Sequence, residues 1–241
     1  MGHKSSKGGK PSGMLVTPRG IARFLALFLL AYGASMAPWP GLGSIYAAAY
    51  RTGASLLFRS FGSQGIVRFE PLPGRPWEIN VALYNRARAG RGGIVPGIQT
   101  CHDTRDEGYL YVAFLTALIL AHPLPWRRKG RALLWGMALI HVLIVLKLGL
   151  RLFHAFSREP LALVTLSPFA GRVLSAAHQV FAVNITFGFV VSIVIWLLVC
   201  FRREDWLGVM RLQKGSTEAK AIPRLGRTTP APRQSETSAP P

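Results

Sequence analysis

Residues 108–150 read GYLYVAFLTALILAHPLPWRRKGRALLWGMALIHVLIVLKLGL, which is two apolar runs joined by a short basic turn. A helix needs roughly 20 apolar residues to cross a hydrocarbon core of about 30 Å. The runs from Gly108 to Trp126 and from Ala132 to Leu150 both approach that length. Each is therefore predicted to span a membrane.

Two further apolar runs, about Ile21 to Trp39 and about Phe181 to Phe201, have similar lengths. Composition agrees, because 50% of the residues are hydrophobic, only 16% are charged and the mean hydropathy is +0.28. Soluble domains usually carry about 25% charged residues. The sequence therefore predicts an α-helical integral membrane protein with about four transmembrane helices and a small external α/β insertion.

Basic residues gather at the ends of these runs and indicate the orientation. In a four-span arrangement three basic clusters fall on one side, and that side is the cytoplasm because Lys and Arg are retained there. We expect an inner (cytoplasmic) membrane protein with several spans, an uncleaved first span and both termini in the cytoplasm. The clusters are Lys4, Lys7, Lys10, Arg19 and Arg23; Arg127, Arg128, Lys129 and Arg131; and Arg202 and Arg203.

The formal net charge of +19 resembles that of a nucleic-acid-binding protein. Membrane topology and contact with anionic lipid account for much of that charge. No motif of interleaved aromatic and basic residues accompanies it. The lipid bilayer is thus an expected partner, and nucleic acid is not.

The segment between the first two spans is predicted to form the external subdomain. Gly41 to Phe61 is small and apolar with few charges, which favours a helix lying on the outer surface. Short strands are expected at Ile66 to Phe69, Trp77 to Tyr84 and Gly93 to Ile98. The predicted domains are a disordered basic tail (1–17), the first transmembrane helix (18–39), the external subdomain (40–107), a three-helix transmembrane core (108–203) and a mostly disordered cytoplasmic tail (204–241).

The two cysteines, Cys101 and Cys200, lie at opposite ends of predicted spans. A membrane thickness of about 30 Å separates them, whereas a disulfide needs Cα atoms within about 7 Å. Cys101 is thus an unpaired thiol at the outer face. Polar residues expected at the same face are Arg105, Arg151, His154 and His178.

Those neighbours suggest a cysteine-nucleophile site. Positive charge stabilises a thiolate, and an imidazole can accept or donate a proton during attack on a carbonyl. Two other interpretations stay open. Cys101 can be a small apolar filler at a span end, or His102, Asp103, His154 and His178 can bind zinc, although no ligand pair has a recognised metal spacing.

In this arrangement the chain resembles the exosortase/archaeosortase family. These multi-span membrane proteins are regarded as cysteine transpeptidases that process C-terminal sorting signals of exported proteins. The family places a Cys before one span, an Arg at the end of the next, and a His or Arg at the start of the one after. Cys101, Arg151 and His178 follow that order, and the resemblance covers about Gln99 to Cys200.

The chain departs from the family in three ways. Cys101-His102-Asp103 stands where the family usually has Cys-Ser-Gly, Lys147 stands where an Asn is common, and there are fewer spans. The resemblance implies that Cys101 attacks a peptide carbonyl, that His178 acts as acid and base, and that Arg151 holds the oxyanion or thiolate. Arg105 and His154 are secondary candidates.

The implied function is a membrane cysteine transpeptidase or peptidase, a hydrolase-type activity in protein sorting. It needs no cofactor and no metal. Its partner is an exported protein with a C-terminal membrane anchor, and the oligomeric state is left open. The alternative is a non-enzymatic assembly or scaffold factor in envelope or polysaccharide export.

Overall fold

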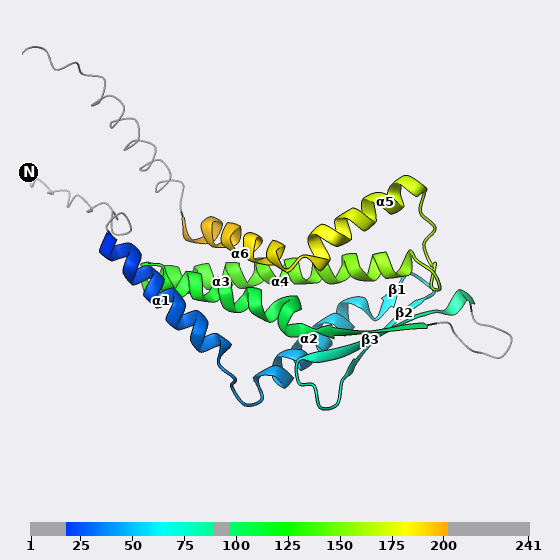
Figure 1. Cartoon of the computed structure of the whole chain (residues 1–241), viewed down its shortest axis with the longest axis horizontal. Coiled ribbons are helices and arrows are strands. Elements are labelled where there is room, and N and C mark those ends of the chain that lie inside the picture. The colour runs from blue at the N-terminus through cyan, green and yellow to red at the C-terminus, as the bar shows by residue number, and fades with distance from the viewer. Residues whose placement is uncertain (1–17, 89–96, 202–241) are drawn as a thin grey trace, which may run out of the picture. The chain divides into compact units, whose positions relative to one another are not determined.

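The computed structural model describes residues 18–88 and 97–201, which are mostly helical with one small sheet (Figure 1). The sheet contains β1 (Ser60–Phe61), β2 (Gly65–Pro71), β3 (Glu78–Asn85) and β4 (Gly97–Asp103). The helices are α1 (Pro18–Met36), α2 (Leu42–Phe58), α3 (Leu110–Ala121), α4 (Trp126–Phe156), α5 (Pro168–Ala177) and α6 (Ile185–Cys200), with the shorter turns η2 (Arg86–Arg88), η3 (Arg105–Tyr109) and η4 (His178–Val183).

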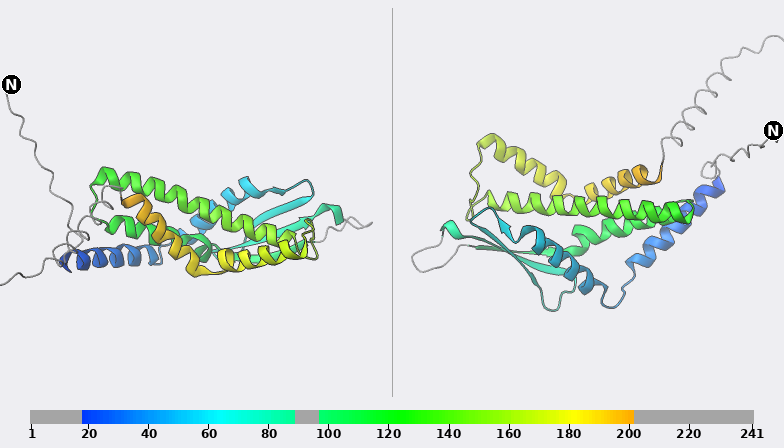
Figure 2. Two further views of the ribbon diagram at one scale, coloured as in Figure 1. Left: turned by 90° about the horizontal axis from the view of Figure 1, so that it is seen from above. Right: turned by 180° about the vertical axis from the view of Figure 1, so that it is seen from behind.

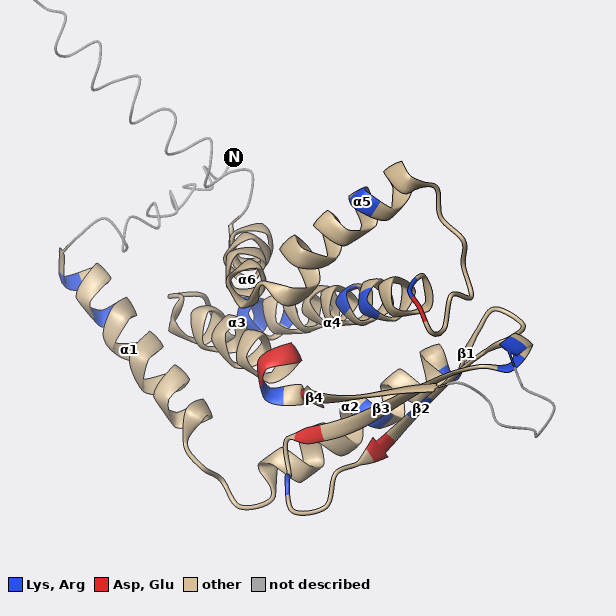
Figure 3. Ribbon diagram, turned by 45° about the vertical axis from the view of Figure 1, so that its right-hand side comes forward, with Lys and Arg blue, Asp and Glu red and all other residues tan. Residues whose placement is uncertain are grey.

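Four helices form a helical body. Helix α3 packs against α1, α4 and α6, and α4 also packs against α6 (Figures 1 and 2). Helices α3 and α6 carry no charged residue (Figure 3). None of the α1 side chains is buried. Large apolar side chains such as Leu30, Leu134 and Leu198 lie exposed on the outside of this body.

By length and composition, α1 and α4 can each cross a membrane, and a third span exists if η4 and α5 together with α6 form one broken span bent by 70°. The second expected span is short because the chain is extended at His122, directly before Pro123. A residue that precedes proline is disfavoured in the helical region. The fourth expected span is broken by the extended backbone of Asn184.

The sheet is antiparallel in the order β1-β2-β3-β4. The predicted strands at Ile66 to Phe69 and Trp77 to Tyr84 are confirmed as β2 and β3, and the helix predicted at Gly41 to Phe61 is confirmed as α2. The third predicted strand, Gly93 to Ile98, overlaps β4 at Gly97 and Ile98, and its residues 93–96 lie outside the described residues. Strand β4 continues to Asp103, so Cys101 lies within a strand instead of on the approach to a helix.

One face of the sheet is buried under α2 and the C-terminal half of α4. Buried side chains alternate along β2 and point to this face, as a half-exposed strand requires. The face and its two helices enclose a shared apolar core: Ala47, Ala54, Val67, Phe69, Ile79, Val81, Leu83, Leu148, Leu152, Phe156 and Leu161. This core joins the sheet and the helical body into one compact unit ending at Cys200.

The predictions for the tails at 1–17 and 204–241 lie outside the described residues, as do Arg202 and Arg203 of the third basic cluster.

Candidate functional site

A cavity of about 360 Å³ lies between the sheet and the ends of two helical segments. Strands β3 and β4 form one wall, and α4 and η4 form the other. Four of the predicted site residues border it, namely Cys101, Arg151, His154 and His178. The fifth, Arg105, lies elsewhere, with its guanidinium carbon 5.9 Å from the centre of the Trp77 ring.

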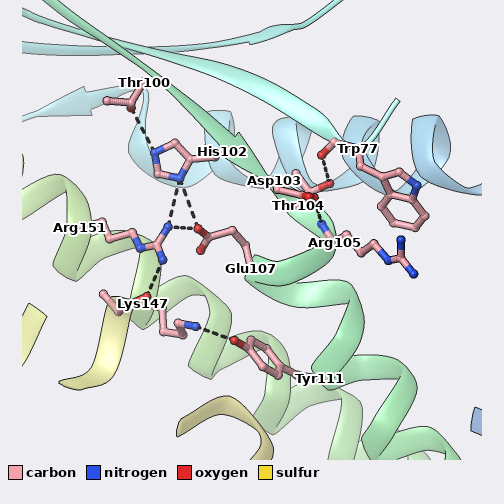
Figure 4. A network of polar contacts seen from close by, with 11 residues as sticks. Trp77, Thr100, His102, Asp103, Thr104, Arg105, Glu107, Tyr111, Lys147 and Arg151 are labelled. Atoms are coloured by element: carbon pink, nitrogen blue, oxygen red, sulfur yellow. Dashed lines mark hydrogen bonds and ion pairs between the residues drawn. The ribbon is translucent and has the colours of Figure 1, made fainter. Parts of the chain in front are cut away.

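Arg151 forms a buried ion pair with Glu107 at the edge of this cavity (Figure 4). The two side chains are only 20% and 10% exposed. Arg151 Nη2 also donates a hydrogen bond of 2.5 Å to the carbonyl oxygen of Ala182. One guanidinium on α4 thus ties together η3 at the start of α3 and η4 before α6.

His102 completes this polar cluster from β4. Its Nδ1 lies 3.3 Å from Arg151 Nη1 and 3.6 Å from Glu107 Oε1. Burial, helped by the charge of Arg151, lowers the pKa of His102 to about 4. Because Arg151 already neutralises the adjacent Glu107 carboxylate, burial determines the direction of the pKa shift, and the imidazole is neutral at pH 7.

The end of β4 fixes where Glu107 points. The Thr104 hydroxyl donates to the carbonyl oxygen of Trp77 at 2.6 Å, and the Thr104 amide donates to the same oxygen at 2.9 Å. The Asp103 carboxylate accepts from the amide of Arg105 at 2.8 Å. These hydrogen bonds fix the point at which β4 ends and the helical turn η3 begins. The η3 turn then directs the Glu107 side chain inward.

Lys147 lies one helical turn before Arg151 and is 3% exposed. Its Nζ donates to the Tyr111 hydroxyl at 3.1 Å and lies 4.6 Å from the centre of the same ring. The lysine predicted to be a departure from the family pattern therefore joins α4 to α3.

His154 and His178 stack with ring centres 4.1 Å apart and an interplanar angle of 7°. This brings two of the predicted residues together across α4 and η4. His154 Nε2 and Arg151 Nε are both buried without a hydrogen-bond partner in the described part of the chain.

Cys101 differs from these residues in the direction of its side chain. Successive side chains of a strand point to opposite faces, and those of Thr100 and His102, which contact each other at 3.2 Å, point to the cavity face. The thiol therefore points to the outer face of the sheet, beside its cross-strand partner Asn80. The pKa of Arg75 is raised chiefly by Glu78 and also by Cys101, which agrees with that placement.

Both cysteines are free, Cys101 exposed and Cys200 buried. Within residues 18–88 and 97–201, no group of three or more His, Cys, Asp or Glu side chains is arranged to hold a metal ion. Comparison with models of known families, with curated proteins and with solved structures finds no match. The site is thus interpreted from its own geometry.

Sequence reasoning missed Glu107, which is the charge partner of Arg151. A signal was present, because Glu107 is an acid directly ahead of an apolar run and Arg151 is a base at the end of the next one. Antiparallel neighbours bring such positions together. The pairing depends on the η3 turn, however, and no sequence pattern indicated that turn.

Proposed function

We propose that the chain is a non-enzymatic membrane scaffold that holds a small sheet module at the outer face of the inner membrane. The membrane assignment is supported by α1 and α4, which are long and apolar enough to span, and by their exposed apolar side chains. Bands of exposed apolar side chains of this kind are covered by lipid or by another protein. The basic clusters at the span ends support the orientation, with both termini in the cytoplasm.

The observation that carries the scaffold proposal is the buried Glu107–Arg151 pair. Arg151 is neutralised by the Glu107 carboxylate of η3 and bonded to the Ala182 carbonyl of η4, so its guanidinium is used in joining three helical segments. An arginine that stabilises a thiolate or an oxyanion needs a free positive charge aimed at it. The thiol of Cys101 lies on the other face of the sheet.

The test compares two variants in a strain that lacks the chromosomal copy. Cys101→Ala is expected to restore surface polysaccharide display and detergent resistance fully. Glu107→Ala is expected to fail, because it leaves the Arg151 charge buried without its carboxylate partner and destabilises the junction of η3, α4 and η4. Immunoblots of the membrane fraction control for protein level. Loss of function in Cys101→Ala at a normal protein level would contradict the scaffold proposal.

A cysteine transpeptidase or peptidase is the second candidate, and one observation favours it. Cys101, Arg151 and His178 come from three separate elements and all border the same cavity. In this mechanism His178 accepts the proton of the Cys101 thiol, the thiolate attacks a peptide carbonyl to form a thioester, and His178 returns the proton to the leaving amine. An amine or water then releases the acyl group.

This candidate predicts that the Cys101→Ala strain accumulates exported proteins with their C-terminal anchors intact. It also predicts that the Cys101 thiol reacts rapidly with alkylating reagents near neutral pH, and that His178→Ala slows the reaction. A matched His141→Ala variant serves as control, because His141 lines a different cavity and its Nδ1 donates to the Met137 carbonyl oxygen at 2.7 Å. Equal alkylation rates in all three proteins would exclude an activated thiol.

A further inference from the structure

Strand β4 forms a long open edge of the sheet. It pairs with β3 on one side, and among the described residues no strand pairs with its other side. Gly97, Gln99, Thr100 and Cys101 are exposed. The opposite edge is β1, a strand of only two residues.

The register shows which backbone groups face the open edge. The Thr104 amide donates to Trp77, its counterpart in the β3–β4 register, at 2.9 Å. Hydrogen-bonded pairs alternate along an antiparallel ladder, so His102 and Thr100 also bond to β3. The N–H and C=O groups of Gln99 and Cys101 therefore point outward.

An edge of this kind normally attracts another strand. Natural proteins protect such edges with lysine, proline, bulges or very short strands. β1 is protected by its length, whereas β4, with the sequence Gly-Ile-Gln-Thr-Cys-His-Asp, contains neither lysine nor proline. An open edge that is kept unprotected beside a cavity is suited to binding an extended peptide.

The cavity provides pockets for the side chains of such a peptide. A strand added at β4 would direct alternate side chains to the cavity face. The lining there is apolar at Val81, Leu83 and Val183, and it is polar at Thr100, His154 and His178. The site thus fits apolar side chains together with one hydrogen-bonding side chain.

Charge near the cavity indicates the character of the flanking residues. A second cavity of about 540 Å³ shares His154 with the first. Its described lining contains Arg158 and Arg172 and no acidic side chain. Arg158 Nη2 donates a hydrogen bond of 3.3 Å to the Ser175 hydroxyl. An acidic flank on the bound segment would complement these two guanidinium groups.

We propose that the β4 edge binds an extended, acidic-flanked segment of an exported polypeptide as a fifth strand. The inference rests on the proposed function, because it requires the sheet to face the exterior. It adds the partner that the scaffold holds. It does not depend on any chemistry of Cys101. A second copy of this chain is the competing occupant, and the experiment separates the two.

Cys101 serves as the reporter in the test. The full chain is reconstituted in lipid nanodiscs with Cys200→Ala, so that a single thiol remains. The probe is an octapeptide of alternating valine and threonine with two aspartates at its N-terminus and a chloromethyl ketone at its C-terminus. The thiol displaces chloride and forms a thioether. A second probe carries N-methyl groups at alternate residues, and N-ethylmaleimide measures intrinsic thiol access.

The free-backbone peptide is expected to label Cys101 at least about tenfold faster than the N-methylated peptide, since each lost edge hydrogen bond weakens docking. Gln99→Pro should bring the ratio of the two labelling rates to about 1, because it removes an outward N–H without breaking the hydrogen bonds between β3 and β4. Gln99→Ala keeps the N–H and should keep the ratio. N-ethylmaleimide should label all three proteins equally, and exchanging the aspartates for lysines should slow the peptide.

Equal rates for the two peptides would overturn the proposal. The second contradicting result is the formation, without peptide, of dimers cross-linked through Cys101 that Gln99→Pro prevents. Such dimers would assign the β4 edge to a second copy of the chain and would also overturn the proposal. Failure of the scaffold proposal is scored separately, by loss of cellular function in Cys101→Ala. The labelling ratio does not depend on that result.

Discussion

Replacing Glu107 by alanine is expected to cause the largest loss of stability of any single polar substitution at the site. The change leaves Arg151 charged, 20% exposed and without its carboxylate partner. The remaining bond to the Ala182 carbonyl supplies no opposite charge. His102 cannot compensate either, because it adds no negative charge.

Breaking a buried pair by removing one partner costs about 3–5 kcal/mol. For a protein of this size about 1 kcal/mol lowers the melting temperature by about 2–4 °C, so the expected decrease is roughly 6–20 °C. The double variant Glu107→Gln/Arg151→Met removes both charges and should recover much of the loss. The recovery measures the coupling between the two side chains.

The assay is thermal unfolding in one detergent at one protein concentration, followed by intrinsic tryptophan fluorescence. Glu159→Gln is the matched control, because Glu159 pairs with Arg88 at the surface, where the side chains are 72% and 43% exposed. Exposed ion pairs contribute little to the free energy of unfolding, so this variant should have the melting temperature of the wild type. Glu107→Ala and Glu159→Gln melting at the same temperature would refute the assignment of Glu107–Arg151 as a stabilising buried pair between η3 and α4.

Two further predictions concern neighbouring parts of the fold. The folded-state pKa of His102 is about 4, below its ordinary 6.5, so its contribution to stability is complete above pH 6.5 and about 3 kcal/mol is lost as the pH falls to 4. His102→Asn should therefore weaken the pH dependence of the unfolding free energy, measured by urea unfolding, between pH 6.5 and 4. An unchanged pH dependence would contradict the burial argument. Gly188 packs face to face with the Tyr111 ring, which a Cβ would overlap, so Gly188→Ala should destabilise by about 1–3 kcal/mol. Gly171→Ala is its control, because open space surrounds Gly171 and alanine is the better helix former there; equal melting of the two variants would argue against close packing of α6 on α3.

Much of the fold follows from local patterns. Apolar runs located α1 and α4, small apolar residues located α2, and alternation located β2 and β3. Each of these signals is contained within one segment. The failures arose where tertiary contacts or single residues set the boundary. Prolines after His122 shorten α3, and the break at Asn184 bends the segment before α6.

The site could be predicted only in part. Span order correctly indicated that Arg151, His154 and His178 lie near one another, because residues at the ends of antiparallel helices meet at one level. It could not show the direction of the Cys101 side chain. That direction depends on whether a residue is in a strand or a helix and on its parity within the strand. A register shift by an odd number of residues reverses the face to which each side chain points.

The strand assignment of Cys101 bears on both proposed functions. A thiol on the outer face of the sheet is separated by the sheet itself from His178, and a proton transfer needs the two within about 3 Å or one bridging water. A one-residue shift in the β3–β4 register would bring the thiol to the cavity and send His102 away from Arg151 and Glu107. That shift would break the buried cluster and expose Ile98, whose side chain packs against the core. The same contacts that stabilise the sheet thus keep the thiol from the histidines, which is why the structure favours a binding edge over a catalytic centre.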